Sequence, residues 1–312
     1  MVVFEDFEWD DITPIDIAET TAPLCHILYT EEFKKVMGYA KALMAQKEYS
    51  ERAYFITDEV INIASAHYTI WKYRFDIVVH LKKNLVQELD WCDNIAYENE
   101  KNYQIWPYRQ QIIELLEKET ESVDDLLKLE YPLLDIMIEQ DSKNYHVWSH
   151  RRWLVEKFKL YRTQRELEFT NDKINLDVRN NSAWNHRFLV QFGDIESNSS
   201  CDKEYLRDEI ILTKDKIDLC PENPSSWNYL QAIYKKFSVI LLIEDLNLFA
   251  IQYTHLVENP RVISIQALEL TAEIYQKSDK NKSEEIYELL STTYDPIRKN
   301  YWSFCKNLLY QN

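Results

Sequence analysis

The sequence predicts an all-α protein, an α-α superhelix (solenoid) of stacked antiparallel helical hairpins. Glycine occurs only twice and proline eight times in 312 residues. Dinucleotide-binding turns, phosphate loops and two-residue β-hairpins depend on glycine for positive φ angles, so the sequence argues against all three. Tryptophan recurs at intervals of 35 to 43 residues, at Trp71, Trp106, Trp148, Trp184 and Trp227. Such a repeat is typical of helical hairpins, which bury their apolar faces only by stacking on one another.

The chain is expected to consist of an arm and one helical domain. Residues 1–28 contain two prolines and no sustained period, and we expect an extended N-terminal arm there. From Thr30 onwards the apolar residues follow helical spacing, and we expect residues 29–312 to form a single α-helical solenoid domain. The tryptophan repeats occupy about residues 50–236, and the divergent residues 237–312 are expected to form capping helices.

Further residues recur at fixed distances from the tryptophans. Four residues before them stand His67, Asn102, Asn144, Asn180 and Asn223. Three residues after the first four stand Arg74, Arg109, Arg151 and Arg187. Two residues after all five stand Tyr73, Tyr108, His150, His186 and Tyr229. We interpret the tryptophans and arginines as structural. Each tryptophan should fill the core between hairpins, and each arginine should bond to backbone carbonyls or to an acid of the neighbouring repeat.

Polar residues and a proline mark the starts of the tryptophan helices. Asn144 is suited to cap the helix of Trp148, because its short side chain can accept from free N–H groups of the first turn. Pro107 is tolerated only near a helix start, so its helix should begin close to Tyr103 or Gln104.

Second helices are expected between the tryptophan motifs, for example at Leu126–Glu139 and Glu166–Leu176. The second follows a capping-box pattern, Thr163-Gln-Arg-Glu166. A longer loop is expected at Asp194–Asp202. Beyond the repeats, helical patterning continues over Ser238–Glu258, Ile263–Gln276 and Glu284–Gln311.

Composition narrows the class of protein. The formal charge of −17 would repel a phosphate backbone, so a nucleic-acid partner is not expected. The five cysteines are scattered and never form a C-x-x-C pair, which fits reduced thiols in a cytoplasmic protein. No apolar stretch is long enough for a membrane span, and no signal peptide is evident. Tetratricopeptide repeats also use a tryptophan hairpin, but they need a glycine in each repeat.

Candidate chemistry gathers at the starts of the tryptophan helices. His146 and His150 share a helix face, yet no third ligand is nearby and His150 occupies a repeat position, so no zinc site is expected in this chain. Lys143 would add an ammonium to a helix N-terminus that already favours phosphate or diphosphate; the alternative is a solvated surface lysine. Basic residues occupy this position in three repeats, namely Lys101, Lys143 and Arg179. The Gln104 amide could donate to a carboxylate or simply cover its helix start.

The repeat resembles that of the α subunits of protein prenyltransferases, whose hairpins carry an Asn-x-x-x-Trp-x-x-Arg core. The most specific stretches are Asn102–Trp106, Lys143–Trp148, Asp177–Asn185, Glu156–Leu160, Ala267–Leu270 and Ile297–Trp302. The similarity runs from about Trp9 to the C-terminus. It is closer to the α subunit shared by protein farnesyltransferase and geranylgeranyltransferase type I than to the Rab-specific α subunit.

The resemblance implies an obligate heterodimeric enzyme. Such an enzyme transfers an isoprenoid from its diphosphate to the cysteine of a C-terminal Cys-a-a-X (CaaX) motif, for example in small GTPases. The β subunit of the family holds zinc and most of the isoprenoid pocket, so the α chain alone should be inactive. Any magnesium requirement would depend on the β subunit. The sequence does not determine which β subunit, and hence which isoprenoid, is used.

The resemblance also implies roles for single residues. Lys143 matches the family lysine that contacts the isoprenoid diphosphate, and we expect Lys143 and Tyr145 to be catalytic. His146 and Asn180 match residues near the same site. Gln104 matches the glutamine that holds the substrate's C-terminal carboxylate.

Two other functions stay open at this point. One is the Rab-specific α subunit, which uses the same repeat but needs an escort protein. The other is a helical scaffold without a catalytic role. Lys143, Tyr145 and Gln104 favour an enzyme over the scaffold, because packing does not require them.

Overall fold

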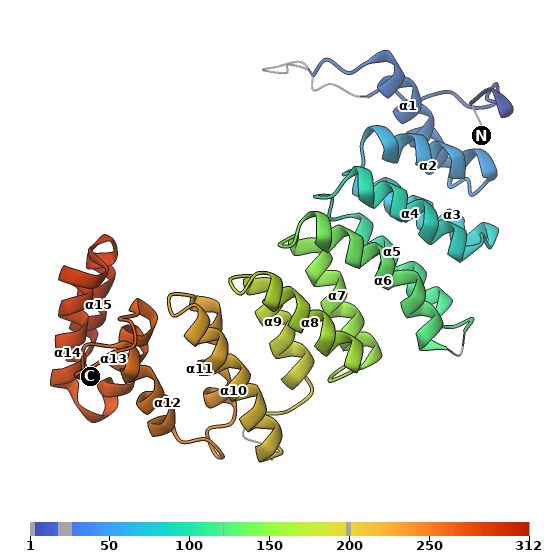
Figure 1. The fold of residues 1–312 in the computed structure, drawn as a ribbon. Coiled ribbons are helices and arrows are strands. Elements are labelled where there is room, and N and C mark those ends of the chain that lie inside the picture. The colour runs from blue at the N-terminus through green and yellow to red at the C-terminus, as the bar shows by residue number, and fades with distance from the viewer. Residues whose placement is uncertain (1–3, 18–26, 121, 198–200, 312) are drawn as a thin grey trace. The chain divides into compact units, whose positions relative to one another are not determined.

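The structure, a computed structural model, describes residues 4–17, 27–120, 122–197 and 201–311. Every regular element among these residues is a helix, with no strand among them, which confirms the predicted all-α fold. In chain order the helices are α1 (Glu31–Gln46), α2 (Glu51–Ile63), α3 (Tyr68–Leu81), α4 (Leu85–Glu98), α5 (Ile105–Leu116), α6 (Val123–Gln140), α7 (Tyr145–Phe158), α8 (Gln164–Leu176), α9 (Asn181–Phe192), α10 (Lys203–Leu219), α11 (Pro224–Lys236), α12 (Ile243–Ala250), α13 (Ile265–Ser278), α14 (Lys280–Leu289) and α15 (Lys299–Leu308), as labelled in Figure 1.

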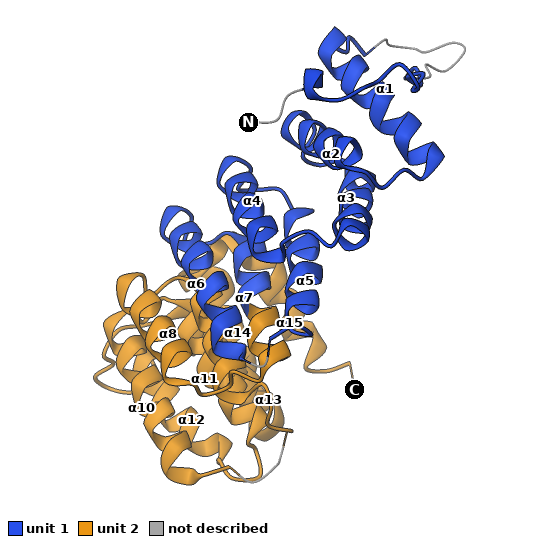
Figure 2. Ribbon diagram, turned by 90° about the vertical axis from the view of Figure 1, so that its right-hand side faces the viewer, with its two compact units in different colours: residues 1–151 blue, residues 152–312 orange. Residues whose placement is uncertain are grey.

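Two compact units make up the chain, residues 1–151 and residues 152–312 (Figure 2). In the first unit α2 packs on α3 and α4 on α5, while α3 also contacts α5 and α4 contacts α6. In the second unit α8 packs on α9, α10 on α11, and α9 contacts α11. Within each unit the tryptophan helices therefore form one layer and the intervening helices the other.

Short connections join the two helices of each pair. Four residues join α2 to α3, α6 to α7, α8 to α9 and α10 to α11, whereas six residues join α4 to α5. Neighbouring helices joined by so short a turn run antiparallel, as in an αα-hairpin. The predicted helical hairpins are therefore present.

The recurrent tryptophans are buried, as predicted, with exposed fractions of 0 to 7%. Four of them also fix the turn before their helix, because the indole N–H donates to the carbonyl six residues earlier. These bonds are Trp71 to Ser65 (2.7 Å), Trp148 to Ser142 (3.0 Å), Trp184 to Val178 (2.8 Å) and Trp227 to Pro221 (2.8 Å). Trp106 is the exception.

Buried arginines pair with acids, as predicted. Three of them reach a glutamate of the next helix, in the pairs Arg74–Glu88 (2.6 Å), Arg109–Glu130 (2.7 Å) and Arg187–Glu209 (2.5 Å). Arg151 contacts Asp135 of α6 at 2.8 Å. Because each of the three glutamates lies in the hairpin after its arginine, the ion pairs tie consecutive hairpins together.

These three glutamates and a fourth, Glu166, are buried and each accepts a hydrogen bond from the following tryptophan helix. The donors stand two residues after the tryptophans, in the pairs Tyr108–Glu88 (2.5 Å), His150–Glu130 (2.6 Å), His186–Glu166 (2.8 Å) and Tyr229–Glu209 (2.5 Å). Burying a carboxylate is tolerated only when it is paired and hydrogen-bonded, and these partners meet that need. The interpretation of His150 as a packing residue is confirmed.

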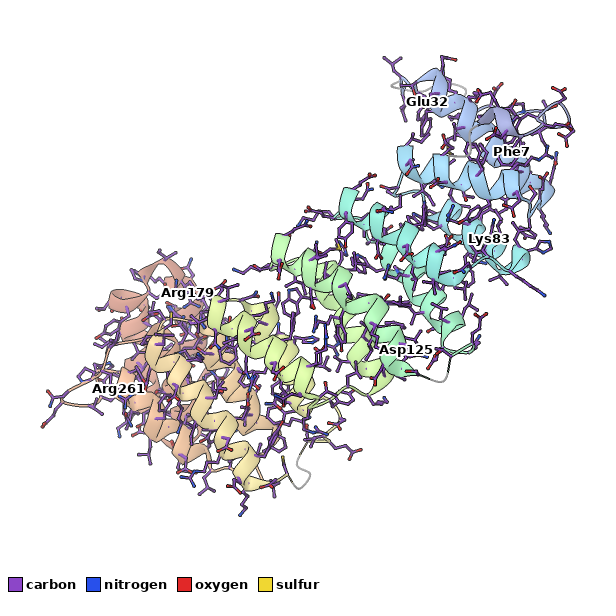
Figure 3. The ribbon with its side chains drawn as sticks, turned by 45° about the vertical axis from the view of Figure 1, so that its right-hand side comes forward. Phe7, Glu32, Lys83, Asp125, Arg179 and Arg261 are labelled. Carbon is purple, nitrogen blue, oxygen red and sulfur yellow. The ribbon has the colours of Figure 1, made fainter. Side chains whose placement is uncertain are left out.

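The described part of the arm is held against the first helices. Phe7, labelled in Figure 3, packs against Phe55 of α2 with ring centres 5.3 Å apart. Arg52 of α2 forms a bidentate ion pair with Asp11, both bonds at 2.7 Å. The rest of the predicted arm, residues 18–26, lies outside the described residues.

Two predicted helix starts had different outcomes. The Thr30 hydroxyl accepts from the Phe33 N–H at 3.1 Å and caps α1. The capping box at α8 was wrong, because Thr163 makes no cap bond and donates instead to the Leu160 carbonyl at 3.0 Å. Glu166 cannot complete a box, since it is buried and bonded to a histidine of α9.

The C-terminal helices are shorter than predicted. Within Ser238–Glu258 the α-helix covers only Ile243–Ala250, followed by one 3₁₀ turn. The helix expected over Glu284–Gln311 is interrupted. The α-helix α14 ends at Leu289 and a π-helical turn follows to Tyr294, and α15 begins at Lys299 after a 3₁₀ turn that starts at Pro296. The predicted helix at Ile263–Gln276 is confirmed by α13.

The loop predicted at Asp194–Asp202 lies between α9 and α10, although its centre, residues 198–200, is outside the described residues. No helix in the described parts of the chain is long and apolar enough to cross a membrane.

Candidate functional site

Asn144 caps α7 and connects two helix starts. Its side-chain oxygen accepts from the N–H groups of His146 (3.0 Å) and Val147 (3.3 Å), as predicted. Its amide nitrogen donates to the carbonyl of Glu100, in the turn before α5, at 2.9 Å. The side chain is therefore fixed at both ends, and it holds the start of α7 beside the turn that leads into α5.

The residues that flank Asn144 point outward. Lys143 is exposed, and its backbone N–H donates to the Asp141 carboxylate at 3.1 Å. Tyr145 is 77% exposed, and its ring meets His146 edge-on at 5.7 Å. His146 is half-buried. The start of α7 thus carries an exposed ammonium and an exposed phenol beside a half-buried imidazole.

His150 points into the protein. Its Nε2 lies 2.6 Å from Glu130, and the amide nitrogen of Gln110 lies 3.5 Å from its Nδ1. Burial lowers the pKa of His150 although the bond to Glu130 opposes the shift, so the ring is neutral and donates to the carboxylate. His150 is thus committed to Glu130 and does not form a metal pair with His146. Nor does any group of three or more potential metal ligands occur elsewhere in the described residues.

The turn before α5 carries a second lysine and Gln104. Lys101 forms an ion pair with Asp141, whose pKa it lowers through this hydrogen bond. The backbone N–H of Gln104 donates to the Asn102 side chain at 2.7 Å, while the Gln104 side chain makes no cap bond. Since Asp141 contacts both lysine residues, the structure brings Lys101 close to Lys143.

Asn180 belongs to the second unit. It is 1% exposed and caps α9, with its side-chain oxygen accepting from the N–H groups of Ser182 (3.1 Å) and Ala183 (3.4 Å). Beside it, Arg179, labelled in Figure 3, occupies the repeat position of the two lysines. Its Nε lies 3.3 Å from Cys220 Sγ. Within this unit Asn180 acts as a helix cap.

Sequence reasoning missed the buried glutamates. They stand 18 residues before a tryptophan in four repeats, as Glu88, Glu130, Glu166 and Glu209. Extending the repeat comparison to that offset would have found them. Sequence reasoning also did not single out Lys101, although Lys-Asn-Tyr occurs at residues 101–103 as well as at 143–145.

Comparisons with known proteins agree with this architecture. Residues 85–116, 117–158, 163–191 and 206–237 match the family described as protein prenyltransferase alpha subunit repeat. The chain is 45% identical over 305 residues to the protein farnesyltransferase/geranylgeranyltransferase type-1 subunit alpha of Candida albicans, with 96% of each chain covered. It is 31% identical over 309 residues to the protein of the same name from Dictyostelium discoideum, covering 97% of this chain and 92% of the relative.

A solved structure is similar as well. It is described as Candida albicans protein geranylgeranyltransferase-I complexed with GGPP, and one of its chains matches with a TM-score of 0.88 and 43% identity. The match covers 97% of this chain and 99% of that chain. The chain therefore belongs to the protein prenyltransferase α-subunit family.

Proposed function

We propose that the chain is the α subunit of a heterodimeric CaaX prenyltransferase, shared by protein farnesyltransferase and geranylgeranyltransferase type I. The observation that carries this proposal is the 45% identity over nearly the whole length of a relative with that name. The exposed polar residues at the starts of α5 and α7 support it further, because a scaffold needs no such residues there.

The reaction joins the cysteine sulfur, as a thiolate whose proton has passed to solvent, to the first carbon of the isoprenoid and breaks the bond from that carbon to the diphosphate oxygen. The diphosphate leaves with the electron pair and gains negative charge as it departs. A cation held near the leaving oxygen stabilises this charge more in the transition state than in the ground state, and so speeds the chemical step.

The cations that we assign to this task are Lys143 and Lys101. Both stand directly before the asparagine of their repeat and both are exposed. Asp141 connects them, since it accepts from the Lys143 backbone and pairs with the Lys101 ammonium. Tyr145, exposed at the first position of α7, adds a phenol that can donate to the same phosphate oxygens.

Gln104 is assigned to the terminal carboxylate of the CaaX substrate. Its side chain is not used as a helix cap, and an amide N–H is a suitable donor to a carboxylate. His146 and Asn180 complete the proposed set, His146 through its half-buried ring and Asn180 by fixing the start of α9.

Zinc is assigned to the β subunit. The described residues of this chain do not fit a zinc site, because His150 is bound to Glu130 and no cluster of three ligands occurs among them. Any magnesium requirement is likewise assigned to the β partner. The cysteines that the structure describes, Cys92, Cys201, Cys220 and Cys305, are free thiols, and a cytoplasmic location remains our expectation.

Co-expression with each candidate β subunit tests the proposal. We expect the chain to co-purify with a farnesyltransferase β subunit and with a geranylgeranyltransferase type I β subunit. Each heterodimer should then use the isoprenoid diphosphate of its β subunit to modify a CaaX peptide. Full turnover by the purified α chain alone would overturn the proposal, as would failure to bind either β subunit. Activity only with an added escort protein would favour the Rab-specific enzyme.

A further inference from the structure

The tryptophan helix that follows Gln104 starts late. Helices α3, α7, α9 and α11 each begin three residues before their tryptophan, but α5 begins only one residue before Trp106. The connection into α5 is longer by two residues, and these residues are Tyr103 and Gln104. The repeat with the proposed carboxylate-binding side chain is thus the one in which that side chain lies before the helix.

Two buried donors near this start have no acceptor. Trp106 is 5% exposed, yet its indole N–H lacks the bond to the carbonyl six residues earlier that the other four tryptophans make. The amide nitrogen of Asn102 is also without a partner within the described chain. The matching nitrogens of Asn144 and Asn223 bond to carbonyls at 2.9 Å and 2.6 Å. The backbone between Asn102 and Trp106 therefore departs from the repeat geometry.

A missing cap does not explain the difference. Asn102 is present and still accepts from the Gln104 N–H at 2.7 Å. Conversely, His67 makes no side-chain cap bond, yet α3 begins at the usual place, three residues before Trp71. The cause must lie elsewhere in the α5 repeat.

Pro107 is the residue that distinguishes this repeat. The position directly after the tryptophan holds Lys72, Ser149, Asn185 and Asn228 in the other repeats. In a helix that began at Tyr103, the N–H of residue 107 would donate to the Tyr103 carbonyl. Proline has no N–H, and its ring clashes with the carbonyl four residues earlier, so Pro107 disfavours a helix that includes Tyr103. Pro132 lies in the interior of α6, where the long helix on both sides of it is maintained by packing, whereas Pro107 lies within one turn of a helix start.

We infer that Pro107 is a positioning residue for substrate recognition. It keeps Tyr103 and Gln104 out of α5, so that the Gln104 amide projects from a turn towards the substrate carboxylate. Without the proline, Gln104 would become the second residue of the first turn, as His146 is in α7. This inference rests on the proposed carboxylate role of Gln104. Pro107 itself is exposed and would not need to touch the substrate.

Replacing the proline in the α/β heterodimer tests the inference. The variant Pro107→Ser restores an N–H and introduces the residue that α7 has at this position. Amide hydrogen exchange over residues 103–109 should become slower, because the helix gains its missing turn. The KM for a CaaX peptide should rise towards that of Gln104→Ala, by about tenfold if one charge-assisted hydrogen bond is lost, with kcat unchanged. Lys72→Ser, an exposed change at the same repeat position of α3, should alter neither quantity.

The possible outcomes separate two failures. Unchanged hydrogen exchange in Pro107→Ser would overturn the inference directly. Slower exchange with an unchanged peptide KM would also overturn it, provided that Gln104→Ala raises the KM. If Gln104→Ala leaves the KM unchanged, the carboxylate role of Gln104 is wrong and the positioning role falls with it. A difference in KM between free-acid and amidated peptides in the wild-type enzyme shows that the enzyme recognises the terminal carboxylate of the peptide.

Discussion

Neighbouring residues at the start of α7 have different roles, some on the surface and some in the packed core. Lys143 and Tyr145 face outward, whereas Trp148 and His150 are buried in the stack. The repeat predicted the burial of Trp148 and His150 correctly, because residues at a position that recurs from hairpin to hairpin usually pack the hairpins together. The buried glutamates escaped notice because an isolated glutamate is almost always exposed. Their burial depends on arginine, tyrosine and histidine partners that only the packed structure reveals.

Gln104 provides a prediction at the scale of one residue. Gln104→Glu replaces the amide donor with a carboxylate of the same shape, which should repel the substrate's terminal carboxylate. The KM of a free-acid CaaX peptide should rise by about tenfold or more, the effect of losing a hydrogen bond to a charged group. The KM of the amidated peptide should change much less. Steady-state kinetics with the two peptides measures this, and equal increases for both would contradict carboxylate recognition.

Among the helices, the buried ion pairs connect one hairpin to the next. Glu130 of α6 binds Arg109 from the hairpin before and His150 from its own tryptophan helix. Burial raises the pKa of Glu130, but Arg109 and His150 outweigh burial and lower it to about 2. The carboxylate is therefore charged in the folded protein over the physiological range.

Removing this carboxylate should destabilise the first unit strongly. Glu130→Ala leaves Arg109 buried without a counter-charge, and breaking such a pair costs about 3–5 kcal/mol. Glu139→Ala, in the same helix but exposed, should change stability by less than about 0.5 kcal/mol. Denaturant unfolding of the two variants, each in complex with the β subunit, measures the difference. Equal stabilities would show that the glutamate contributes nothing to the stack.

His150 makes the stack sensitive to mild acid. Its pKa is lowered in the folded state, mainly by burial, so below about pH 6.5 the unfolded chain binds more protons than the folded one. The contribution of His150 is thus complete above about pH 6.5 and is lost as the pH falls. Glu130, with a folded pKa of about 2, loses its contribution only below about pH 4.5.

The variant His150→Tyr should remove the part of this pH dependence of stability that is due to His150 and leave the part that is due to Glu130. Tyr108 and Tyr229 already donate to the equivalent glutamates, and Trp71–Tyr108 and Trp106–His150 have similar ring separations, 5.1 and 5.0 Å. Thermal unfolding of His150→Tyr should therefore vary less between pH 7 and pH 5 than that of wild type. The control is His146→Tyr, the same substitution at a histidine that is half-buried in the first turn of α7. An unaltered pH profile in His150→Tyr would contradict the assignment.

Helix interiors were easier to predict than helix ends. Apolar spacing placed α1, α6 and α13 correctly, because it reflects the face that each helix buries. The end of a helix depends instead on single bonds. Thr163 makes no cap bond and donates to the Leu160 carbonyl, while the Glu166 carboxylate is bonded to a histidine of α9. The same dependence on single residues makes Pro107 consequential, since one missing N–H moves the start of α5.

For the whole chain, the five-fold repeat was enough to predict a stack of helical hairpins. The candidate site was only partly predictable, because Lys101, Lys143 and Tyr145 are exposed residues that the repeat does not require. Lys143, Tyr145 and Gln104 stood out through resemblance, while the link from Lys101 through Asp141 required the packed structure. Residues that a β subunit would contribute are absent from this sequence altogether.

The net charge predicts a preference among substrates. With a formal charge of −17, the subunit should attract peptides that carry several lysines before the CaaX motif. Their KM should be lower than that of a neutral peptide at low ionic strength. The difference should vanish near 1 M salt, where the screening length is about 3 Å. A salt-independent preference for the basic peptide would contradict an electrostatic origin.

The most direct test of the account is the single-turnover rate of the heterodimer when its lysines are changed. At least one of Lys143→Ala and Lys101→Ala should slow isoprenoid transfer by about 10²-fold, the usual effect of losing one group that stabilises developing charge. Binding of the isoprenoid diphosphate should weaken much less than the rate falls. Lys128→Ala, an exposed change in α6 away from both helix starts, is the control. Wild-type rates in both Lys143→Ala and Lys101→Ala would contradict the claim that this chain supplies the cation for the leaving diphosphate.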